Sequence, residues 1–203
     1  MREKTSRFFS TRAPWREHQG DFAGAIADYE RARAVIKESF SQWSGPRSVA
    51  VVSLYEIGGI ENGLGHMDRA NQCYDQALAE AETVARESSE RGTSSRARGR
   101  ILARRGQATE ALALITENVR LSENTRDVPL IMVQRLYRAE VLALLGRADD
   151  AIAELRSLHE AGHPFAYTLR ANQELAALRG DARFQKLMAE AEARANAQPR
   201  PKK

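Results

Sequence analysis

Apolar side chains recur at three- and four-residue steps along most of this chain, which is the period of an amphipathic helix. The strict alternation of apolar and polar residues that marks a half-buried strand is missing. This pattern predicts an all-α chain, with helices over residues 22–40, 47–64, 67–88, 94–105, 107–121, 129–144, 148–160, 165–178 and 182–195.

The two ends of the chain fit this pattern less well. Met1–Arg12 has no clear apolar face, and Pro14 would interrupt any helix that precedes Gly20. We therefore expect a poorly ordered or degenerate first helix over residues 1–19, followed by a helical repeat domain over residues 20–195. Residues 196–203 contain two prolines and end on basic residues, so we expect a flexible basic tail there.

Four glycines in the helical region share the same pattern of neighbours. Gly65 is followed by an alanine after five residues, an aromatic residue after nine and an alanine after twelve. These positions are Ala70, Tyr74 and Ala77 after Gly65; Ala25, Tyr29 and Ala32 after Gly20; Ala111 and Ile115 after Gly106; and Ala151, Leu155 and Leu158 after Gly146. The small residues Ala13, Gly58, Gly99 and Ala139 stand seven before each glycine. The glycines are 45, 41 and 40 residues apart, which indicates a stacked array of helical repeats.

At these residues the chain resembles the tetratricopeptide-repeat (TPR) family, over roughly residues 13–158. The resemblance implies a right-handed α-α superhelix, a TPR-like solenoid of four to five antiparallel helical hairpins. The chain is a divergent example, because its repeat is longer than the family's 34 residues. In addition, Arg135 and Arg138 occupy places where the family carries large apolar residues in the first helix of a repeat.

The segment LRGDARFQKLM, at residues 178–188, is similar to the closing segment of bacterial TPR arrays. Those arrays follow serine/threonine kinases, nucleotide cyclases or winged-helix regulators. The sequence has no glycine-rich phosphate loop and no kinase His-Arg-Asp motif, so we expect a non-catalytic protein. Two functions remain open: a scaffold that binds proteins in the cytoplasm, or a regulatory and sensory module of a bacterial kinase or transcription regulator.

The strongest charge feature is Arg91–Arg105, which holds six arginines and no acidic residue. Arg96, Arg100 and Arg104 are four residues apart and share one helix face. The family resemblance implies that this face lines a concave groove together with Tyr55, Asn62, Leu136 and Glu140. Such a groove would be basic in the middle and would suit an acidic peptide or protein. The alternative is that the arginines pair with acids of the preceding helix: Asp75, Glu80, Glu82, Glu87 and Glu90.

The segment His159–His163 satisfies the H-E-x-x-H pattern of zinc hydrolases. That chemistry needs both histidines on one continuous helix, and Pro164 disfavours the helical conformation at His163. We therefore expect a helix C-terminus and no metal or other cofactor. The single cysteine, Cys73, is interpreted as a small core residue.

Composition excludes only a few classes of binding partner. The net charge is +4 and the pI is about 9.4, which permits an acidic partner. No aromatic residue lies between Arg91 and Arg105, which speaks against nucleic acid, and no apolar run is long enough to span a membrane. A homo-oligomer is a further alternative, if the apolar face of residues 22–40 has no proper covering helix.

Overall fold

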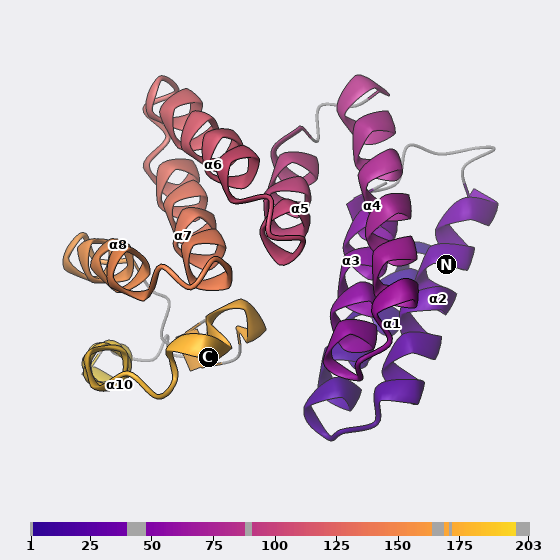
Figure 1. Ribbon diagram of the computed structural model, residues 1–203, viewed down its shortest axis with the longest axis horizontal. Coiled ribbons are helices and arrows are strands. Elements are labelled where there is room, and N and C mark those ends of the chain that lie inside the picture. The colour runs from indigo at the N-terminus through magenta and orange to yellow at the C-terminus, as the bar shows by residue number, and fades with distance from the viewer. Residues whose placement is uncertain (1, 40–47, 88–90, 164–168, 171, 198–203) are drawn as a thin grey trace. The chain divides into compact units, whose positions relative to one another are not determined.

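The computed structural model describes residues 2–39, 48–87, 91–163, 169–170 and 172–197. These residues form α1 (Arg2–His18), α2 (Phe22–Ser39), α3 (Ser48–Gly63), α4 (Met67–Glu87), α5 (Arg91–Arg104), α6 (Ala108–Glu123), α7 (Val128–Leu144), α8 (Ala148–Glu160), the 3₁₀ helix η1 (Gln173–Leu178) and α10 (Ala182–Ala197) (Figure 1). The described part contains no strand, so the all-α prediction is confirmed.

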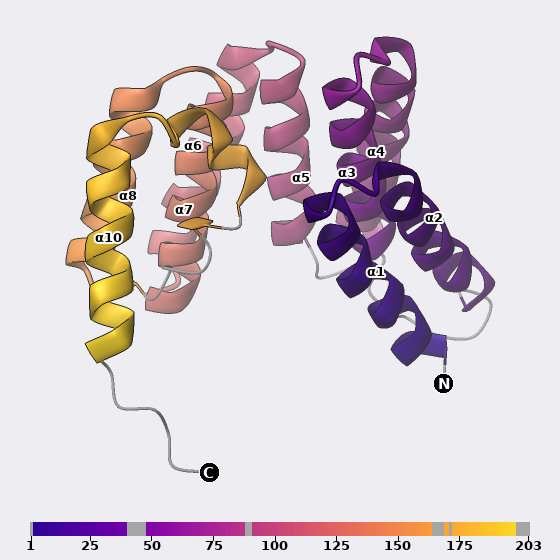
Figure 2. The same cartoon turned by 90° about the horizontal axis from the view of Figure 1, so that it is seen from below.

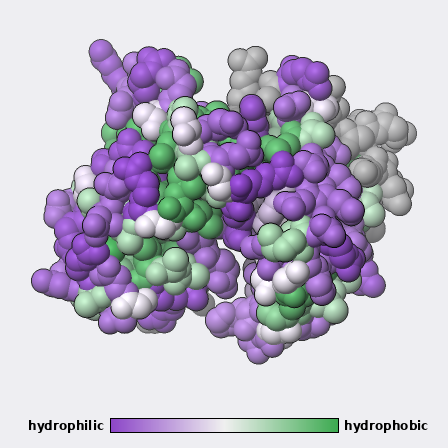
Figure 3. All heavy atoms as spheres, in the orientation of Figure 1, coloured by the Kyte–Doolittle hydropathy of each residue, from purple (hydrophilic) through white to green (hydrophobic). Residues whose placement is uncertain are grey.

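The chain divides into two compact units, Met1–Ile101 and Leu102–Lys203. The first contains α1 to α4 and most of α5, and the second contains the remaining helices. Within the first unit, α1 packs on α2, α2 on α3 and α3 on α4 (Figure 2). Within the second, α7 packs on α6, α8 and η1, while α10 packs on α8. Hydrophilic residues cover most of the face seen in Figure 3, with hydrophobic patches on each unit.

The prediction that Pro14 would interrupt a helix before Gly20 is wrong. The first helix continues through Pro14, because α1 is anchored to α2 on both sides of the proline, by Ala13 and by ion pairs of Arg12 and Arg16. Helix α1 also covers α2, which removes the uncovered face on which the homo-oligomer alternative depended. The predicted helix over residues 165–178 lies partly outside the described residues, and its described end is the 3₁₀ helix η1.

The repeated glycines close the same turn each time. Gly20, Gly65, Gly106 and Gly146 all have a positive φ, between 72° and 82°, which glycine adopts without steric cost. Each glycine N–H donates to the carbonyl three residues earlier, and the next N–H donates to the carbonyl five residues before it. These two bonds define the Schellman motif, which satisfies the last carbonyls of a helix. Gly162, with a φ of 87°, closes a fifth turn of the same kind.

The residue after each of the first four glycines also begins the next helix. Its carbonyl accepts from the N–H of the alanine four residues later, as in the bond from Ala151 to Arg147 at 3.0 Å. The alanines Ala25, Ala70, Ala111 and Ala151 are all buried, as are the larger residues Tyr29, Tyr74, Ile115 and Leu155. The sequence signature therefore combines a turn with one apolar stripe on the second helix.

Neighbouring repeats meet at this stripe. The residue five before a repeat glycine packs in the same cluster as the alanine and large residue of the preceding repeat. The three cases are Ile60 with Ala25 and Tyr29, Ile101 with Ala70 and Tyr74, and Val141 with Ala111 and Ile115. The same contact between neighbouring repeats therefore recurs at these three places along the chain.

Gly58 allows the closest approach within the second repeat. A Cβ atom at this position would lie 2.5 Å from Cε1 of Tyr74, whose side chain is buried. The glycine in α3 is therefore explained by the ring that packs on it from α4. In contrast, nothing lies within 4 Å of a Cβ placed on Gly63, near the end of the same helix.

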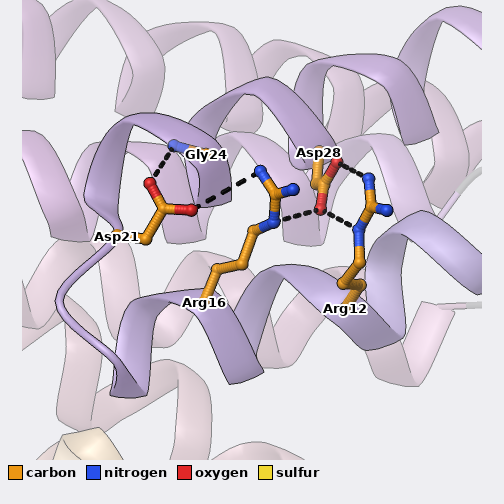
Figure 4. A network of polar contacts seen from close by, with 5 residues as sticks. All are labelled: Arg12, Arg16, Asp21, Gly24 and Asp28. Carbon is orange, nitrogen blue, oxygen red and sulfur yellow. Dashed lines mark hydrogen bonds and ion pairs between the residues drawn. The ribbon is translucent and has the colours of Figure 1, made fainter.

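A buried ion pair joins α1 to α2 (Figure 4). Asp28 is completely buried and accepts two hydrogen bonds from Arg12, from Nε and Nη2, both at 2.6 Å. Nε of Arg16 lies 3.4 Å from the same carboxylate, and its Nη1 lies 3.6 Å from Asp21. The bond from Arg12 lowers the pKa of Asp28 below its ordinary value.

The same pair recurs between α7 and α8. Arg12 stands eight residues before Gly20 and Asp28 eight after it; Arg138 and Glu154 stand at the same distances from Gly146. Nη2 of Arg138 and Nε of Arg135 both donate to Glu154 at 2.6 Å. Arg135 and Arg138, at places where the resemblance implies large apolar residues, are thus compensated by a carboxylate on the facing helix.

We expect Gly58→Ala to lower the free energy of unfolding by about 1–2 kcal/mol, because the added methyl group forces the Tyr74 ring to move. Gly63→Ala is the matched control, and it should stabilise the protein by about 0.5–1 kcal/mol through helix propensity. Urea denaturation of both variants tests the pair. Equal stabilisation by the two substitutions would contradict the close contact.

We expect Asp28→Asn to lower the free energy of unfolding by about 3 kcal/mol at neutral pH, because Arg12 loses a buried ionised partner. A depressed carboxyl pKa contributes stability above the unfolded value of about 4, and this contribution is lost as the pH falls through the folded value. The difference between wild type and Asp28→Asn should therefore shrink below about pH 4. Denaturant titrations across this range measure it, and a pH-independent difference would contradict the assignment.

Candidate functional site

The arginine stripe lies on α5, as its spacing predicts. Arg96, Arg100 and Arg104 are all partly buried, so their stems pack on the protein. The helix spans the boundary of the two units: Arg96 and Arg100 belong to the first, and Arg104 to the second. The surroundings of these residues are therefore described for each unit separately.

In the first unit, Arg100 lies over the ring of Tyr55, with its Cζ atom 5.8 Å from the ring centroid. Tyr55 is itself buried, and its ring lies 6.2 Å from that of Tyr74. A guanidinium group on an aromatic face is held in place by a cation–π interaction. Tyr55 therefore orients the guanidinium group of Arg100. Asn62, another predicted groove residue, is half-buried near the end of the same helix, α3.

In the second unit, two of the predicted groove residues contact the chain's own C-terminal part. Nη2 of Arg104 donates to Oε2 of Glu174 at 2.9 Å, and the carboxylate of Glu174 is buried. Nδ2 of Asn172 donates to Oε1 of the buried Glu140 at 2.6 Å. Because Oδ1 of Asn172 also accepts from the N–H of Glu174, one segment holds both groove residues.

Leu136, the remaining predicted groove residue, is buried in the core of the second unit. That core also contains Leu175 and Leu178 of η1 and Phe184 of α10. The segment from Asn172 to Leu178 is therefore anchored by apolar side chains as well as by its polar ones. It therefore contacts both Arg104 and the buried Glu140.

The contact between Arg104 and Glu174 was not predicted. The sequence alternative paired the arginines with acids of the preceding helix, whereas the carboxylate that Arg104 binds lies 70 residues further along the chain. One signal was available: Glu174 is the single charged residue in the otherwise uncharged stretch 171–178, and Glu140 is likewise embedded among apolar residues of α7. An isolated acid in an apolar stretch indicates a buried partner.

The H-E-x-x-H segment does not form a zinc-hydrolase helix. Helix α8 ends at Glu160, and Gly162 turns the chain with a positive φ. His163 then donates its N–H back to the carbonyl of Leu158, so it lies beyond the helix that carries His159. Burial lowers the pKa of His163, and the carbonyl of His159 accepts a hydrogen bond from Arg194 of α10. The segment is a helix C-terminus, as predicted.

The metal-ligating side chains of the described residues lie apart, and the one thiol, that of Cys73, is partly buried. In the part of the chain that the structure describes, no three His, Cys, Asp or Glu side chains gather to hold a metal ion. Burial raises the pKa of Cys73, which opposes formation of the nucleophilic thiolate. Among the described helices, none has the length and apolar character needed to cross a lipid bilayer.

No protein-family model matches the chain, and no curated protein matches it either. Two solved structures are similar to it. One is a kinesin light chain-like protein of Podosopora anserina with nearly identical TPR-like repeats, at 19% identity and a TM-score of 0.49, covering 98% of this chain and 99% of that one. The other is YrrB, a TPR protein with an unusual peptide-binding site, at 18% identity and a TM-score of 0.36, covering 94% and 86%. By its own turns and packing, the chain consists of repeated helix–turn–helix units, the arrangement that the resemblance to TPR proteins implies.

We expect Arg104→Gln to lower the free energy of unfolding by about 3 kcal/mol, because the buried Glu174 loses its cation. The double variant Arg104→Gln/Glu174→Gln should recover part of this loss, with a coupling energy of about 1–3 kcal/mol. A double-mutant cycle measured by chemical denaturation checks it. The more exposed pair Arg156–Glu190, at 3.0 Å, is the control and should couple by less than about 1 kcal/mol. Equal coupling in the two cycles would contradict the proposed burial of Glu174.

Proposed function

We propose that this protein is a non-catalytic scaffold that binds an acidic peptide or protein partner on the face of α5. The observation that carries the proposal is the register of Arg96 and Arg100, two partly buried arginines of the first unit on one helix face. Stems that pack on the protein lose less conformational freedom when the guanidinium groups bind a ligand. The face is therefore organised before a partner arrives.

Arginine is suited to carboxylates because its planar guanidinium donates two parallel hydrogen bonds. Arg100 is further oriented by its position over the ring of Tyr55. The bond from Arg104 to Glu174 gives an example within the chain of a carboxylate bound to this stripe. A partner would approach Arg96 and Arg100 in the same way, in addition to the contacts that these side chains already make.

The spacing of the two arginines defines the partner's chemistry further. Residues four apart on an α-helix are separated by about 6 Å along its axis. In an extended peptide, residues i and i+2 project to the same side and are about 7 Å apart. We infer that the partner is an extended segment with two acidic residues separated by one other residue. Binding of this kind should weaken as salt screens the charges.

We expect the double variant Arg96→Gln/Arg100→Gln to reduce binding of a labelled Glu-x-Glu peptide at least tenfold, since two charge-assisted contacts are lost. Arg104 is left intact because it binds the buried Glu174. The control variant Arg120→Gln/Arg147→Gln removes the same charge from two exposed arginines and should bind like wild type. Fluorescence anisotropy at low and moderate salt measures the three affinities.

The same three proteins should be compared as baits in native cell lysate, with bound proteins identified by mass spectrometry. Partners retained by wild type and by the control, and lost from the Arg96→Gln/Arg100→Gln variant, would support the proposed face. Equal capture by the three baits, together with equal peptide affinities, would refute it. Circular dichroism ensures that the variants retain the helical content of wild type.

A further inference from the structure

Helix α1 contributes very little apolar side chain to the core of the first unit. Among residues 8–18, whose side chains the structure describes, only Ala13 is buried. Helix α2, on which α1 packs, buries Ala25, Tyr29, Ala32 and Ile36. Burial of apolar surface is the main favourable contribution to folding, and it grows with the area removed from water. Apolar contacts therefore hold α1 in place less firmly than they hold α2.

The helix is also weakened from within by Pro14. Proline has no N–H group, so α1 lacks one of its internal hydrogen bonds, and the proline ring crowds the preceding turn. A single helix of this length is marginal in water even when its sequence favours helix formation. The helical form of α1 therefore depends on its contacts with α2.

The strongest of these contacts are ionic, and they attach α1 to α2 at two points about one turn apart (Figure 4). At the first point, Arg12 donates two hydrogen bonds to the carboxylate of Asp28. At the second, Arg16 lies 3.4 Å from Asp28 through Nε and 3.6 Å from Asp21 through Nη1. Asp21 also accepts a hydrogen bond from the N–H of Gly24 at 2.9 Å, which fixes its carboxylate at the first turn of α2. We call these five residues the polar latch.

Gly24 shows that α2 is built around the polar latch. A Cβ atom at this position would lie 2.1 Å from Oδ2 of Asp21 and 2.3 Å from Nη1 of Arg16. Glycine inside a helix lowers the stability of that helix relative to alanine. At Gly58 the buried ring of Tyr74 fills the space beside the glycine, whereas at Gly24 an ion pair fills it. The glycine of α2 therefore leaves room for a charged contact and not for an apolar one.

We propose that α1 is a flap that opens from α2 as one unit, while α2, α3 and α4 stay folded. When the flap opens, the carboxylate of Asp28 regains the hydration that burial removes, and water replaces the hydrogen bonds of the polar latch. The neighbouring helices have no such compensation, because Ile60 packs with Tyr29 and Leu54 packs with Tyr74. Elements with few buried apolar contacts open at a lower free energy than the rest of a domain.

Opening changes which part of the first unit is in contact with water. In the closed form, Ala13 packs with Ala25 and Tyr29, and Asp28 is completely buried. In the open form, these three side chains of α2 face solvent together, because residues three and four apart share one side of a helix. The proposal uses none of the arginines of α5, so it and the proposed acidic partner can fail independently.

Hydrogen–deuterium exchange of the full chain, resolved by mass spectrometry of overlapping peptides at neutral pH, measures the opening. The amides of residues 9–18 should exchange through one common opening on both sides of Pro14, at least about tenfold faster than the amides inside α3 and α4. Exchange of α1 at the rate of α3 and α4 would overturn the proposal, because α1 would then open only with the whole unit. A rate that falls steadily from residue 9 to residue 18 would also overturn it, since such a gradient indicates fraying of a helix end.

The substitution Gly24→Ala tests the polar latch. The added methyl group displaces Arg16 from Asp21, so exchange of α1 should become about three times faster, as expected for the loss of one exposed ion pair. Exchange of α2 should stay the same or become slower, because alanine favours the helix. Gly63→Ala is the matched control, since nothing lies within 4 Å of its added Cβ, and it should leave exchange of α1 as in wild type. Equal effects of the two substitutions on α1 would contradict the polar latch.

The substitution Arg12→Gln should have a larger effect on the same helix. The closed form would then hold the buried carboxylate of Asp28 without its bidentate partner, whereas the open form hydrates it. Exchange of α1 should rise towards that of an unfolded peptide, while α3, α4 and the second unit keep their wild-type rates. Loss of protection in α3 and α4 together with α1 would overturn the proposal.

Discussion

The structure depends on one exchange of hydrogen bonds, repeated at each glycine turn. A helix normally leaves its last carbonyls without partners. Here the glycine N–H and the N–H that follows it satisfy two of them, and the carbonyl of that next residue begins the following helix. This geometry requires a positive φ and therefore glycine. Because the turn is so short, the two helices that it joins run antiparallel.

Three positions around each turn recur in the core. The small residue before the glycine, the alanine after it and the large residue beyond that place backbone against ring, as Gly58 does under Tyr74. These positions are periodic, so they were visible in the sequence. The boundaries of most helices and the end of α8 at Glu160 followed from the same reasoning.

What the sequence did not reveal depends on contacts between residues far apart. Pro14 is tolerated because Arg12 and Arg16 hold α1 to a buried acid of α2, which a rule about proline alone does not include. The contact between Arg104 and Glu174 joins residues 70 positions apart, and no local period indicates it. The stripe on α5 was correctly placed on one helix face, whereas the ring beneath Arg100 and the carboxylate on Arg104 were visible only in the structure.

The pairing of Arg12 with Asp28 and of Arg138 with Glu154 has a consequence for how such a chain can change over time. At the equivalent places around Gly65, the chain carries Ile57 and Cys73, which pack as apolar neighbours. One type of repeat has the arginine–carboxylate pair and the other has two apolar residues at the same places. A hybrid repeat that took its first helix from one type and its second helix from the other would bury an arginine without its carboxylate, or a carboxylate against an apolar side chain. Recombination within a repeat is therefore penalised, whereas exchange of whole repeats is not. The segment that can be exchanged without breaking such a pair is the complete helix–turn–helix, with the glycine at its centre.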